Sequence, residues 1–308
     1  MQIVDQNETI ARLPASKLIN ALEEMFVQGC DVPLRHSHKI ESGSDGQDGI
    51  FLLMPAWQQG KKFGLKTASV FPGNRTRGLP ALHSTYLLFD AETGVPLAML
   101  DGDTITSRRT AAASALAARY LSRPDSSTLL LVGSGRVGSL IPEAYAAVRP
   151  IRKIMVWDIE NNSAASLAEK LNQAGAVARV VEDLESAVAE ADIVSCATLS
   201  TRPLIQGKWL RPGMHLDLIG GFTPTMRESD NDCYVGTSVF VDTDEALAKA
   251  GDLLEPIAAG VFKEQDVRAR LHELCHGQHP GRTNSEEVTV FKAVGTALED
   301  LAAACAAL

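Results

Sequence analysis

A glycine-rich loop that follows an apolar run is the part of this sequence with the clearest chemical meaning. Residues 128–132 read Thr-Leu-Leu-Leu-Val, and Gly133, Gly135 and Gly138 follow with the spacing Gly-x-Gly-x-x-Gly. The first glycine permits a tight turn, the second lets backbone amides approach a pyrophosphate, and the third lets a helix pack closely against the strand. The helix N-terminus then faces the phosphates. We therefore predict a dinucleotide-binding loop of Rossmann type, formed by Gly133, Ser134, Gly135, Arg136, Val137 and Gly138.

An acidic residue occupies the position that distinguishes NAD(H) from NADP(H) in folds of this type. A second apolar strand is expected at residues 153–157, and Asp158 follows it directly. Asp158 lies about 20 residues beyond the last glycine, as the motif requires. A carboxylate at this point accepts hydrogen bonds from the adenosine ribose hydroxyls and repels a 2′-phosphate. We predict NAD(H) as the favoured cofactor and NADP(H) as the alternative. Thr198, at the end of a later strand, is predicted to contact the cofactor as well.

The segments around this loop alternate between strand and helix. Strands are expected at 128–132, 153–157, 177–181, 192–198, 214–219 and 239–242, and helices at 163–174 and from Asp183 onward. Such alternation is typical of a parallel, doubly wound sheet. The roughly 120 residues before the loop are enough for another domain.

The N-terminal residues have a different pattern. A helix is expected at 14–28, strands at 50–54, 62–70, 84–90 and 96–101, with a turn at 91–94, and an alanine-rich helix at 107–121. Phe291, Val294, Leu298, Leu301 and Cys305 predict a final amphipathic helix, which we expect to return to the first domain. The prediction is an α/β protein with a Rossmann doubly wound parallel sheet, residues 123–283, and a split α+β domain, residues 1–122 with 284–308.

Composition narrows the class of partner. The 308 residues carry a net charge of −9 and only 5% aromatic residues, which argues against nucleic acid or an anionic membrane surface. No apolar run reaches the length of a membrane span, and the N-terminus lacks a signal-peptide pattern, so we expect a cytoplasmic enzyme. The five scattered cysteines are expected to be reduced. Cys275, His276 and His279 lack a fourth ligand, so we expect no metal.

Four blocks in the same order resemble the ornithine cyclodeaminase and mu-crystallin family along nearly the whole chain. They are residues 63–66 with 72–74, residues 104–112, the glycine-rich loop, and residues 291–300. The resemblance implies that the split domain binds substrate and forms a homodimer around a shared β-structure. It also implies nicotinamide-dependent chemistry on cyclic imino acids or amino acids.

Two arginines match the carboxylate-binding arginines of that family, namely Arg35 and Arg109. Planar guanidinium donors suit a substrate carboxylate because they can bind both of its oxygens. Arg109 is expected in the first turn of the alanine-rich helix, where the helix dipole would strengthen an anion site. Arg35 could instead be a surface cation beside Asp31. Arg109 could instead form a salt bridge at the start of the helix, and the adjacent Arg108 could take the carboxylate-binding role in its place.

Lys66 matches the active-site lysine of the family. In a half-buried pocket beside arginines, both desolvation and like charge would lower its pKa, so it could act as acid or base near neutral pH. A lysine facing outward from an alternating strand is the alternative. His83 is a further candidate for contact with the substrate, or an ordinary half-buried strand residue.

Two departures from the cyclodeaminase pattern point to a subtype. Phe222 follows Gly220–Gly221 where cyclodeaminases have a catalytic aspartate, and Leu52 stands where a glutamate recognises the distal amine of ornithine. Burying that ammonium against leucine and phenylalanine would cost several kcal/mol without a counter-charge. A pocket of this kind suits an apolar ring, with Phe222 lining the substrate site.

These observations predict an NAD(P)H-dependent reductase of small cyclic ketimines. Δ1-Pyrroline-2-carboxylate reduced to L-proline is the first choice of reaction, and Δ1-piperideine-2-carboxylate reduced to L-pipecolate is a related one. An ornithine cyclodeaminase or an alanine dehydrogenase-like enzyme is the alternative among enzymes. A mu-crystallin-like protein that binds a small ligand together with a nicotinamide is the alternative outside them.

Overall fold

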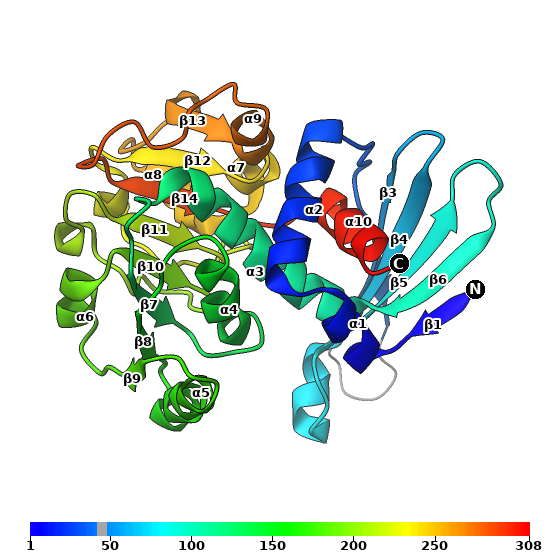
Figure 1. The fold of residues 1–308 in the computed structure, drawn as a ribbon, viewed down its shortest axis with the longest axis horizontal. Coiled ribbons are helices and arrows are strands. Elements are labelled where there is room, and N and C mark those ends of the chain that lie inside the picture. Colours follow the sequence, from blue (N-terminus) through cyan, green and yellow to red (C-terminus); the bar gives the residue numbers. More distant parts are fainter. Residues whose placement is uncertain (42–47) are drawn as a thin grey trace. The chain divides into compact units, whose positions relative to one another are not determined.

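The computed structural model describes residues 1–41 and 48–308, and within them the chain divides into two compact units. The first unit consists of residues 1–109 and 296–308, and the second of residues 110–295 (Figure 1). Across these described ranges, no helix has the length and apolar character needed to cross a membrane.

The first unit is built on a six-stranded sheet with the order β1-β6-β5-β4-β3-β2. Its strands are β1 (Gln2–Val4), β2 (His36–Ile40), β3 (Gly49–Trp57), β4 (Lys62–Val70), β5 (Leu82–Asp90) and β6 (Pro96–Asp101). Strands β2 to β6 pair antiparallel in sequence order, and β1 joins β6 in parallel. The short runs between turn residues predicted β3 to β6, whereas β1 and β2 were not predicted. The turn at 91–94 is confirmed, since the Gly94 amide donates to the Asp90 carbonyl at 2.9 Å.

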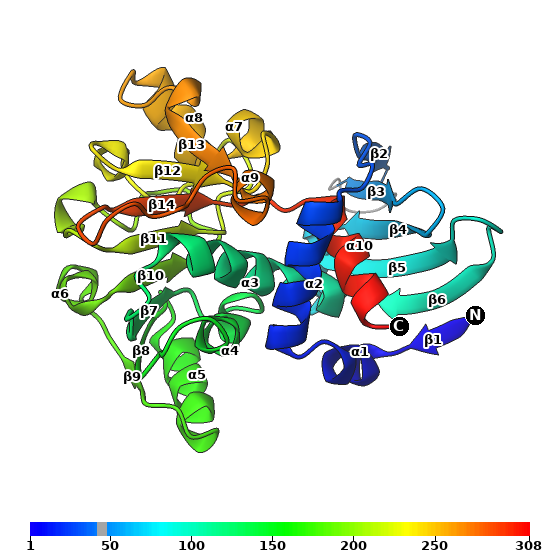
Figure 2. The same cartoon turned by 45° about the horizontal axis from the view of Figure 1, so that its top comes forward.

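Helix α10 (Ala297–Ala306) packs against β3, β4 and β5 on one face of this sheet, and α2 (Ala15–Gln28) packs against α10 (Figures 1 and 2). The strands alternate accordingly, because successive side chains point to opposite faces. Ala56, Lys66, Ala68, Tyr86 and Leu88 are buried on the helix-covered face. The unit also contains α1 (Gln6–Arg12), a 3₁₀ turn at Pro72–Arg77, and the start of α3 (Gly102–Leu121).

The second unit is an eight-stranded, entirely parallel sheet with the order β13-β12-β14-β11-β10-β7-β8-β9, which can be followed down Figure 2. Its strands are β7 (Thr128–Val132), β8 (Lys153–Trp157), β9 (Ala178–Val180), β10 (Ile193–Cys196), β11 (His215–Leu218), β12 (Ser238–Val241), β13 (Val267–Arg270) and β14 (Thr289–Lys292). Its helices are α4 (Ile141–Ala146), α5 (Asn161–Gln173), α6 (Leu184–Glu190), α7 (Glu245–Lys249), α8 (Gly251–Ala258) and α9 (Leu271–Cys275). The predicted α/β class is thus confirmed.

The predicted start of the final helix is wrong. Residues 289–292 form β14, which lies inside the second sheet between β11 and β12, and the helix begins only at Ala297. Gly295, with φ +77°, ends the strand segment, and the Thr296 hydroxyl caps the helix. Residues 284–295 and 110–122 therefore belong to the second unit, whereas the sequence-based boundaries placed them in the first.

Helix α3 begins earlier than expected. The Asp101 carboxylate accepts a hydrogen bond from the Thr104 amide at 2.7 Å and so caps a helix that starts at Gly102. The glycine and the β-branched residues that follow it concealed this start, because such residues have low helix propensity. Arg109 consequently lies about two turns inside the helix, given 3.6 residues per turn. The expected contribution of the helix dipole at Arg109 is therefore wrong.

Candidate active site

The glycine-rich loop has the geometry that its three glycines predict. Gly133 follows β7 with φ +98°, and a Cβ at Gly138 would lie 2.0 Å from the Gly133 carbonyl oxygen. A Cβ at Gly135 would meet nothing within 4 Å, so the space beside its backbone is open. A Cβ at Gly133 would lie 2.8 Å from the Ala197 carbonyl oxygen, which places the segment after β10 beside the loop. The loop thus fits the pyrophosphate of a dinucleotide.

Two alanine substitutions should separate folding from cofactor binding. Gly138→Ala should lower the free energy of unfolding by about 1–3 kcal/mol because its methyl group must displace backbone. Gly135→Ala should keep the unfolding midpoint but weaken NADH binding, because its methyl group occupies the space that the pyrophosphate approaches. Urea unfolding and NADH fluorescence titration measure the two effects. Wild-type NADH affinity in Gly135→Ala would rule out this loop as the pyrophosphate site.

Asp158 directs its carboxylate to the loop. Its Oδ2 accepts hydrogen bonds from the Ser134 amide and hydroxyl, both at 2.7 Å, and its Oδ1 accepts one from the Glu160 amide at 3.0 Å. Burial alone would raise the pKa of Asp158, but these hydrogen bonds outweigh it and hold the pKa below its usual value. Asp158 is therefore an ionised acceptor at neutral pH, as ribose binding requires.

The cofactor preference depends on this charge. We expect the wild type to have a higher kcat/KM with NADH than with NADPH, and Asp158→Ser to narrow the difference, because the serine no longer repels a 2′-phosphate. Asp183→Ser is the matched control, since Asp183 caps α6 through the Ser186 amide and should leave the preference unchanged. A wild type that works better with NADPH would contradict the assignment of Asp158.

A buried acidic cluster holds the ends of β10 and β11. Glu228 accepts hydrogen bonds from the Thr198 amide at 2.6 Å, the Thr198 hydroxyl at 2.8 Å and the Gly220 amide at 2.7 Å. Asp252 accepts from the Glu228 amide at 2.8 Å and pairs with Lys292 at 3.2 Å. Burial raises the pKa of Glu228 to about 7, although Lys292 opposes the shift. The cluster thus fixes Thr198 at the carboxyl edge of the sheet, where dinucleotides bind in such folds.

Phe222 lies just beyond this cluster. It follows Gly220 and Gly221 and is 47% exposed. A Cβ at Gly220 would lie 1.9 Å from the Thr198 carbonyl oxygen, and one at Gly221 would lie 2.2 Å from the Asp252 carboxylate. The two glycines are therefore required by close packing, and they deliver Phe222 to the surface of the second unit.

The first unit contains a second buried cluster, centred on Lys66. The Lys66 Nζ lies 2.6 Å from the Asp300 Oδ2, and the Arg109 Nε lies 2.9 Å from the Asp300 Oδ1. The Arg109 Nη1 lies 2.7 Å from the Glu299 Oε2. All four residues are buried, with both acids fully inaccessible. Strand β4, helix α3 and helix α10 thus bring two cations and two carboxylates together.

The cluster alters the acidity of its members. Burial lowers the pKa of Lys66, and Arg109 and Arg35 lower it further, while Asp300 opposes the shift. Burial opposes ionisation of Asp300, but Lys66 and Arg109 keep its pKa below the usual value. The two carboxylates likewise raise the pKa of Arg109 against the effect of burial. Arg109 and Asp300 are therefore charged, and the lowered pKa makes Lys66 a stronger acid than an exposed lysine.

Tyr86 lies next to Lys66 in the sheet, since the two are register partners on β5 and β4. A Cβ at Gly64 would lie 2.1 Å from the Tyr86 hydroxyl oxygen, so the glycine two residues before Lys66 makes room for this ring. Among the described residues the Tyr86 hydroxyl has no hydrogen-bond partner, although it is buried. Buried polar groups are nearly always paired, so this hydroxyl is suited to a polar ligand.

The remaining candidates of the first unit are placed differently. Arg35 is half-buried and acts electrostatically on Lys66. Leu52 pairs with Ala68 on the same face as Lys66. His83 pairs with Ser69, is exposed, and faces the other side of the sheet. The sheet itself therefore separates His83 from Lys66, and the structure does not bring these two candidates together.

Four buried acids in these clusters were absent from the sequence prediction, namely Asp300, Glu299, Glu228 and Asp252. A signal existed for the first two, because Glu299–Asp300 is the charged pair in the otherwise apolar helix Ala297–Ala306. Charged residues inside an apolar helix are rarely buried without a partner. Glu228 lies in a loop without periodicity, and its sequence gives no comparable signal.

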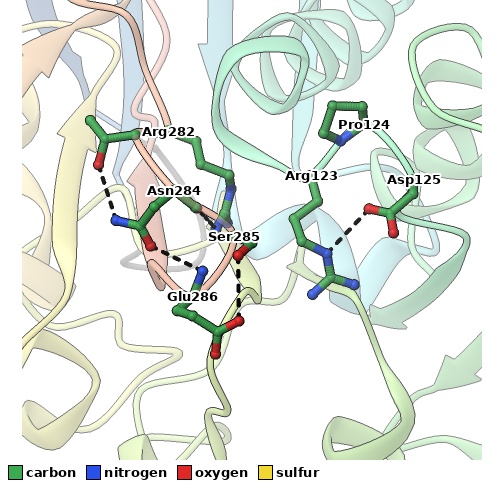
Figure 3. A pocket seen from close by; sticks show the side chains of 8 residues that line it. Arg123, Pro124, Asp125, Arg282, Asn284, Ser285 and Glu286 are labelled. Carbon is green, nitrogen blue, oxygen red and sulfur yellow. Dashed lines mark hydrogen bonds and ion pairs between the residues drawn. The ribbon is translucent and has the colours of Figure 1, made fainter.

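A separate hollow of about 510 Å³ lies in the second unit and is lined by residues 123–125 and 282–286 (Figure 3). Its two arginines are already bound by the chain. Arg123 pairs with Asp192 at 2.8 Å and with Asp125 at 3.3 Å, and Arg282 donates to main-chain carbonyls. These guanidinium groups therefore hold loops together, and the hollow lacks the acid–base chemistry of the Lys66 cluster.

Known proteins resemble this chain along nearly its whole length. The model of the ornithine cyclodeaminase/mu-crystallin family matches residues 2–307. A Δ1-pyrroline-2-carboxylate reductase of Paracoccus denitrificans is 38% identical over 302 residues, covering 97% of this chain and 94% of the relative. The Thermococcus litoralis Δ1-pyrroline-2-carboxylate reductase, solved with NADH and L-proline, has a TM-score of 0.92 at 32% identity, covering 100% of this chain and 96% of its own. An archaeal alanine dehydrogenase dimer with bound NAD has a TM-score of 0.90 at 30% identity, covering 100% and 94%.

Proposed function

Because this chain belongs to the ornithine cyclodeaminase/mu-crystallin family, we propose that it reduces a small cyclic ketimine with a nicotinamide cofactor. The main reaction is the conversion of Δ1-pyrroline-2-carboxylate to L-proline, and Δ1-piperideine-2-carboxylate to L-pipecolate is a related one. The observation that carries the proposal is the buried cluster in which Asp300 holds both Lys66 and Arg109. The relatives named as reductases of this substrate support it.

Arg109 and Arg35 bind the substrate carboxylate. A guanidinium group matches the two oxygens of a carboxylate better than an ammonium does. The two acids orient Arg109 before the substrate arrives, because they hold its Nε and Nη1. Such preorganisation reduces the entropy lost on binding. Arg35 immediately precedes β2, which is joined through β3 to the strand of Lys66, and its positive charge lowers the pKa of Lys66, which supports its place in the same anion site.

Lys66 supplies the proton. When bound, the nicotinamide supplies a hydride to the imine carbon, and the imine nitrogen must then gain one proton. The Lys66 ammonium is buried and its pKa is lowered, which makes it a better acid than an exposed lysine. The product is a saturated ring with one new C–H and one new N–H bond, and solvent later returns a proton to the lysine.

NAD(H) is the favoured cofactor. The open space beside Gly135 and the acceptor position of Asp158 support a dinucleotide whose ribose carries free hydroxyls. Related structures contain NADH or NAD⁺. NADP(H) is the alternative cofactor, and the Asp158→Ser variant is expected to bind it better than the wild type does.

The charge pattern favours reduction over cyclodeamination. Leu52 occupies the Lys66 face of the sheet, where it offers no counter-charge to the distal ammonium of ornithine. Phe222 cannot exchange protons. A preformed ring needs neither group, because its reduction requires only an anchored carboxylate, a hydride and one proton.

Initial rates of NADH oxidation with several substrates test the proposal. Δ1-Pyrroline-2-carboxylate and Δ1-piperideine-2-carboxylate should both react, whereas pyruvate with ammonia should react slowly. The ring sizes are expected to differ modestly, since one methylene changes the free energy of activation by about 1–3 kcal/mol. Faster NADH oxidation with pyruvate and ammonia than with the cyclic imines would indicate an alanine dehydrogenase-like enzyme. No NADH oxidation with any of these substrates would favour a ligand-binding role.

A homodimer is part of the proposal. The sheet face turned away from α2 and α10 carries two apolar cross-strand rows, which are half-buried or exposed: Trp57, Phe63 and Phe89, then Pro55, Leu65, Leu87 and Met99. The Phe63 and Phe89 rings stack at 4.6 Å. Apolar sheet surfaces of this kind are typical of subunit interfaces, and the related alanine dehydrogenase is a dimer.

A further inference from the structure

The geometry of the Lys66 cluster assigns a role to Asp300: it is a positioning residue that keeps the proton on Lys66 until the imine nitrogen takes it. The inference rests on the proposed reduction of a cyclic imine. It concerns a residue that does not itself need to touch the substrate, because one carboxylate holds both the proton donor and the carboxylate-binding arginine.

The two oxygens of Asp300 have different partners. Its Oδ2 lies 2.6 Å from the Lys66 Nζ, and its Oδ1 lies 2.9 Å from the Arg109 Nε. The Arg109 contact is a charge-assisted hydrogen bond, and the Lys66 contact is an ion pair. Full burial of Asp300 excludes water from both contacts. The distance between the proton donor and the anion site is therefore set by the width of a single carboxylate.

Helix α10 explains how the acid reaches this position. The helix starts after the Thr296 cap, and Glu299 and Asp300 lie in its first turn. Acidic side chains are favoured there by the helix dipole. Consecutive helical residues point about 100° apart, so Glu299 and Asp300 reach different atoms of Arg109, its Nη1 and its Nε. The two neighbouring acids thus share the arginine, and the ion pair with Lys66 belongs to Asp300.

The surroundings of Lys66 come from several elements. Asp300 on α10, Arg109 on α3 and Arg35 before β2 are the charged groups that act on it, and Tyr86 on β5 is its register partner. Strand β3 contributes the buried Met54, the register partner of Lys66 on its other side. Two cations and burial favour the neutral amine, and Asp300 opposes them. Without the Asp300 charge, the pKa of Lys66 would therefore be lower still.

The pH profile of kcat separates this role from a merely structural one. Reduction needs protonated Lys66, so kcat should fall as the pH rises through the pKa of Lys66. In Asp300→Asn this alkaline limb should move to lower pH by about 1–3 units, the usual effect of an opposite charge at this distance. Glu299→Gln is the matched control, because it also removes a buried carboxylate from Arg109. It should raise KM while the alkaline limb stays in place.

An unchanged alkaline limb in Asp300→Asn, or equal displacement in both variants, would overturn the assignment. If Asp300→Asn does not fold, as judged by circular dichroism and NADH binding, Asp300→Glu takes its place. That variant retains the charge, so its alkaline limb should stay within about half a unit of the wild type while KM rises. A displacement of about one unit or more would refute the role. Failure of the proposed function is recognised separately, since the wild type would then not reduce the imine at all.

Discussion

Replacing Lys66 with methionine is expected to lower kcat for Δ1-pyrroline-2-carboxylate reduction by about 10²–10⁴-fold, the usual contribution of a positioned general acid. Methionine has a similar length but no proton to give. Asp300 would remain paired with Arg109, so the first unit should stay folded. NADH affinity should persist, because the glycine-rich loop and Asp158 belong to the second unit. Steady-state kinetics and NADH fluorescence measure the two quantities.

Lys62→Met provides the control for this experiment. Lys62 lies on the same strand and is only half-buried, so its loss should leave kcat nearly unchanged. A near-normal turnover number in Lys66→Met would remove Lys66 from the mechanism. A large loss in both variants would instead indicate that β4 is sensitive to any loss of positive charge.

Arg109→Lys is expected to raise the KM for the imino acid by about 10- to 100-fold. Each charge-assisted hydrogen bond contributes about 1.5–3 kcal/mol, and each 1.4 kcal/mol corresponds to a factor of ten in affinity. Lysine keeps the charge but lacks the planar pair of donors. It also cannot hold Asp300 and Glu299 through separate nitrogens as Arg109 does, so the melting temperature should fall as well.

Arg108→Lys is the matched control, because Arg108 is the adjacent arginine. Its Nε donates to the Leu13 carbonyl at 2.7 Å, so its replacement should leave the KM for the imino acid close to the wild-type value. An equal loss of imino-acid and NADH affinity in Arg109→Lys would mean that Arg109 acts only in folding. Unchanged kinetics in Arg109→Lys together with a raised KM in Arg108→Lys would mean that Arg108, and not Arg109, binds the substrate carboxylate.

The sequence predicts local structure well wherever the signal is local. The bounds of β4, β6, β7 and β8 match their predicted ranges, because turn residues flank each apolar run. The glycine-rich loop and Asp158 were predictable because both motif and spacing are contained in one strand–helix–strand unit. The family resemblance is likewise confirmed over residues 2–307.

Elements that depend on distant partners were harder to predict. Residues 289–292 have apolar residues at a spacing compatible with the helix that follows, and only pairing with β11 and β12 makes them a strand. Short apolar runs are ambiguous in this way. The start of α3 depended on the Asp101 cap, which was concealed by residues of low helix propensity.

The site shows the same division. Lys66 and Arg109 were found through motifs, whereas the acid that joins them lies about 190 residues beyond Arg109 in the chain. Periodicity indicates which face of a helix is apolar, but it does not indicate which buried cation a carboxylate will meet. His83 shows what strand prediction leaves open, because the sequence places it on a strand beside β4 and does not indicate that its side chain faces away from Lys66.

The most direct test of the account measures product formation from two substrates with the same purified protein. Incubation with Δ1-pyrroline-2-carboxylate and NADH should yield L-proline, with one NADH consumed for each proline formed. Incubation with L-ornithine and catalytic NAD⁺ should release no ammonia, because Phe222 and Leu52 provide neither the proton-transferring carboxylate nor the counter-charge. Proline and ammonia formed from ornithine at a rate rivalling imine reduction would contradict the account.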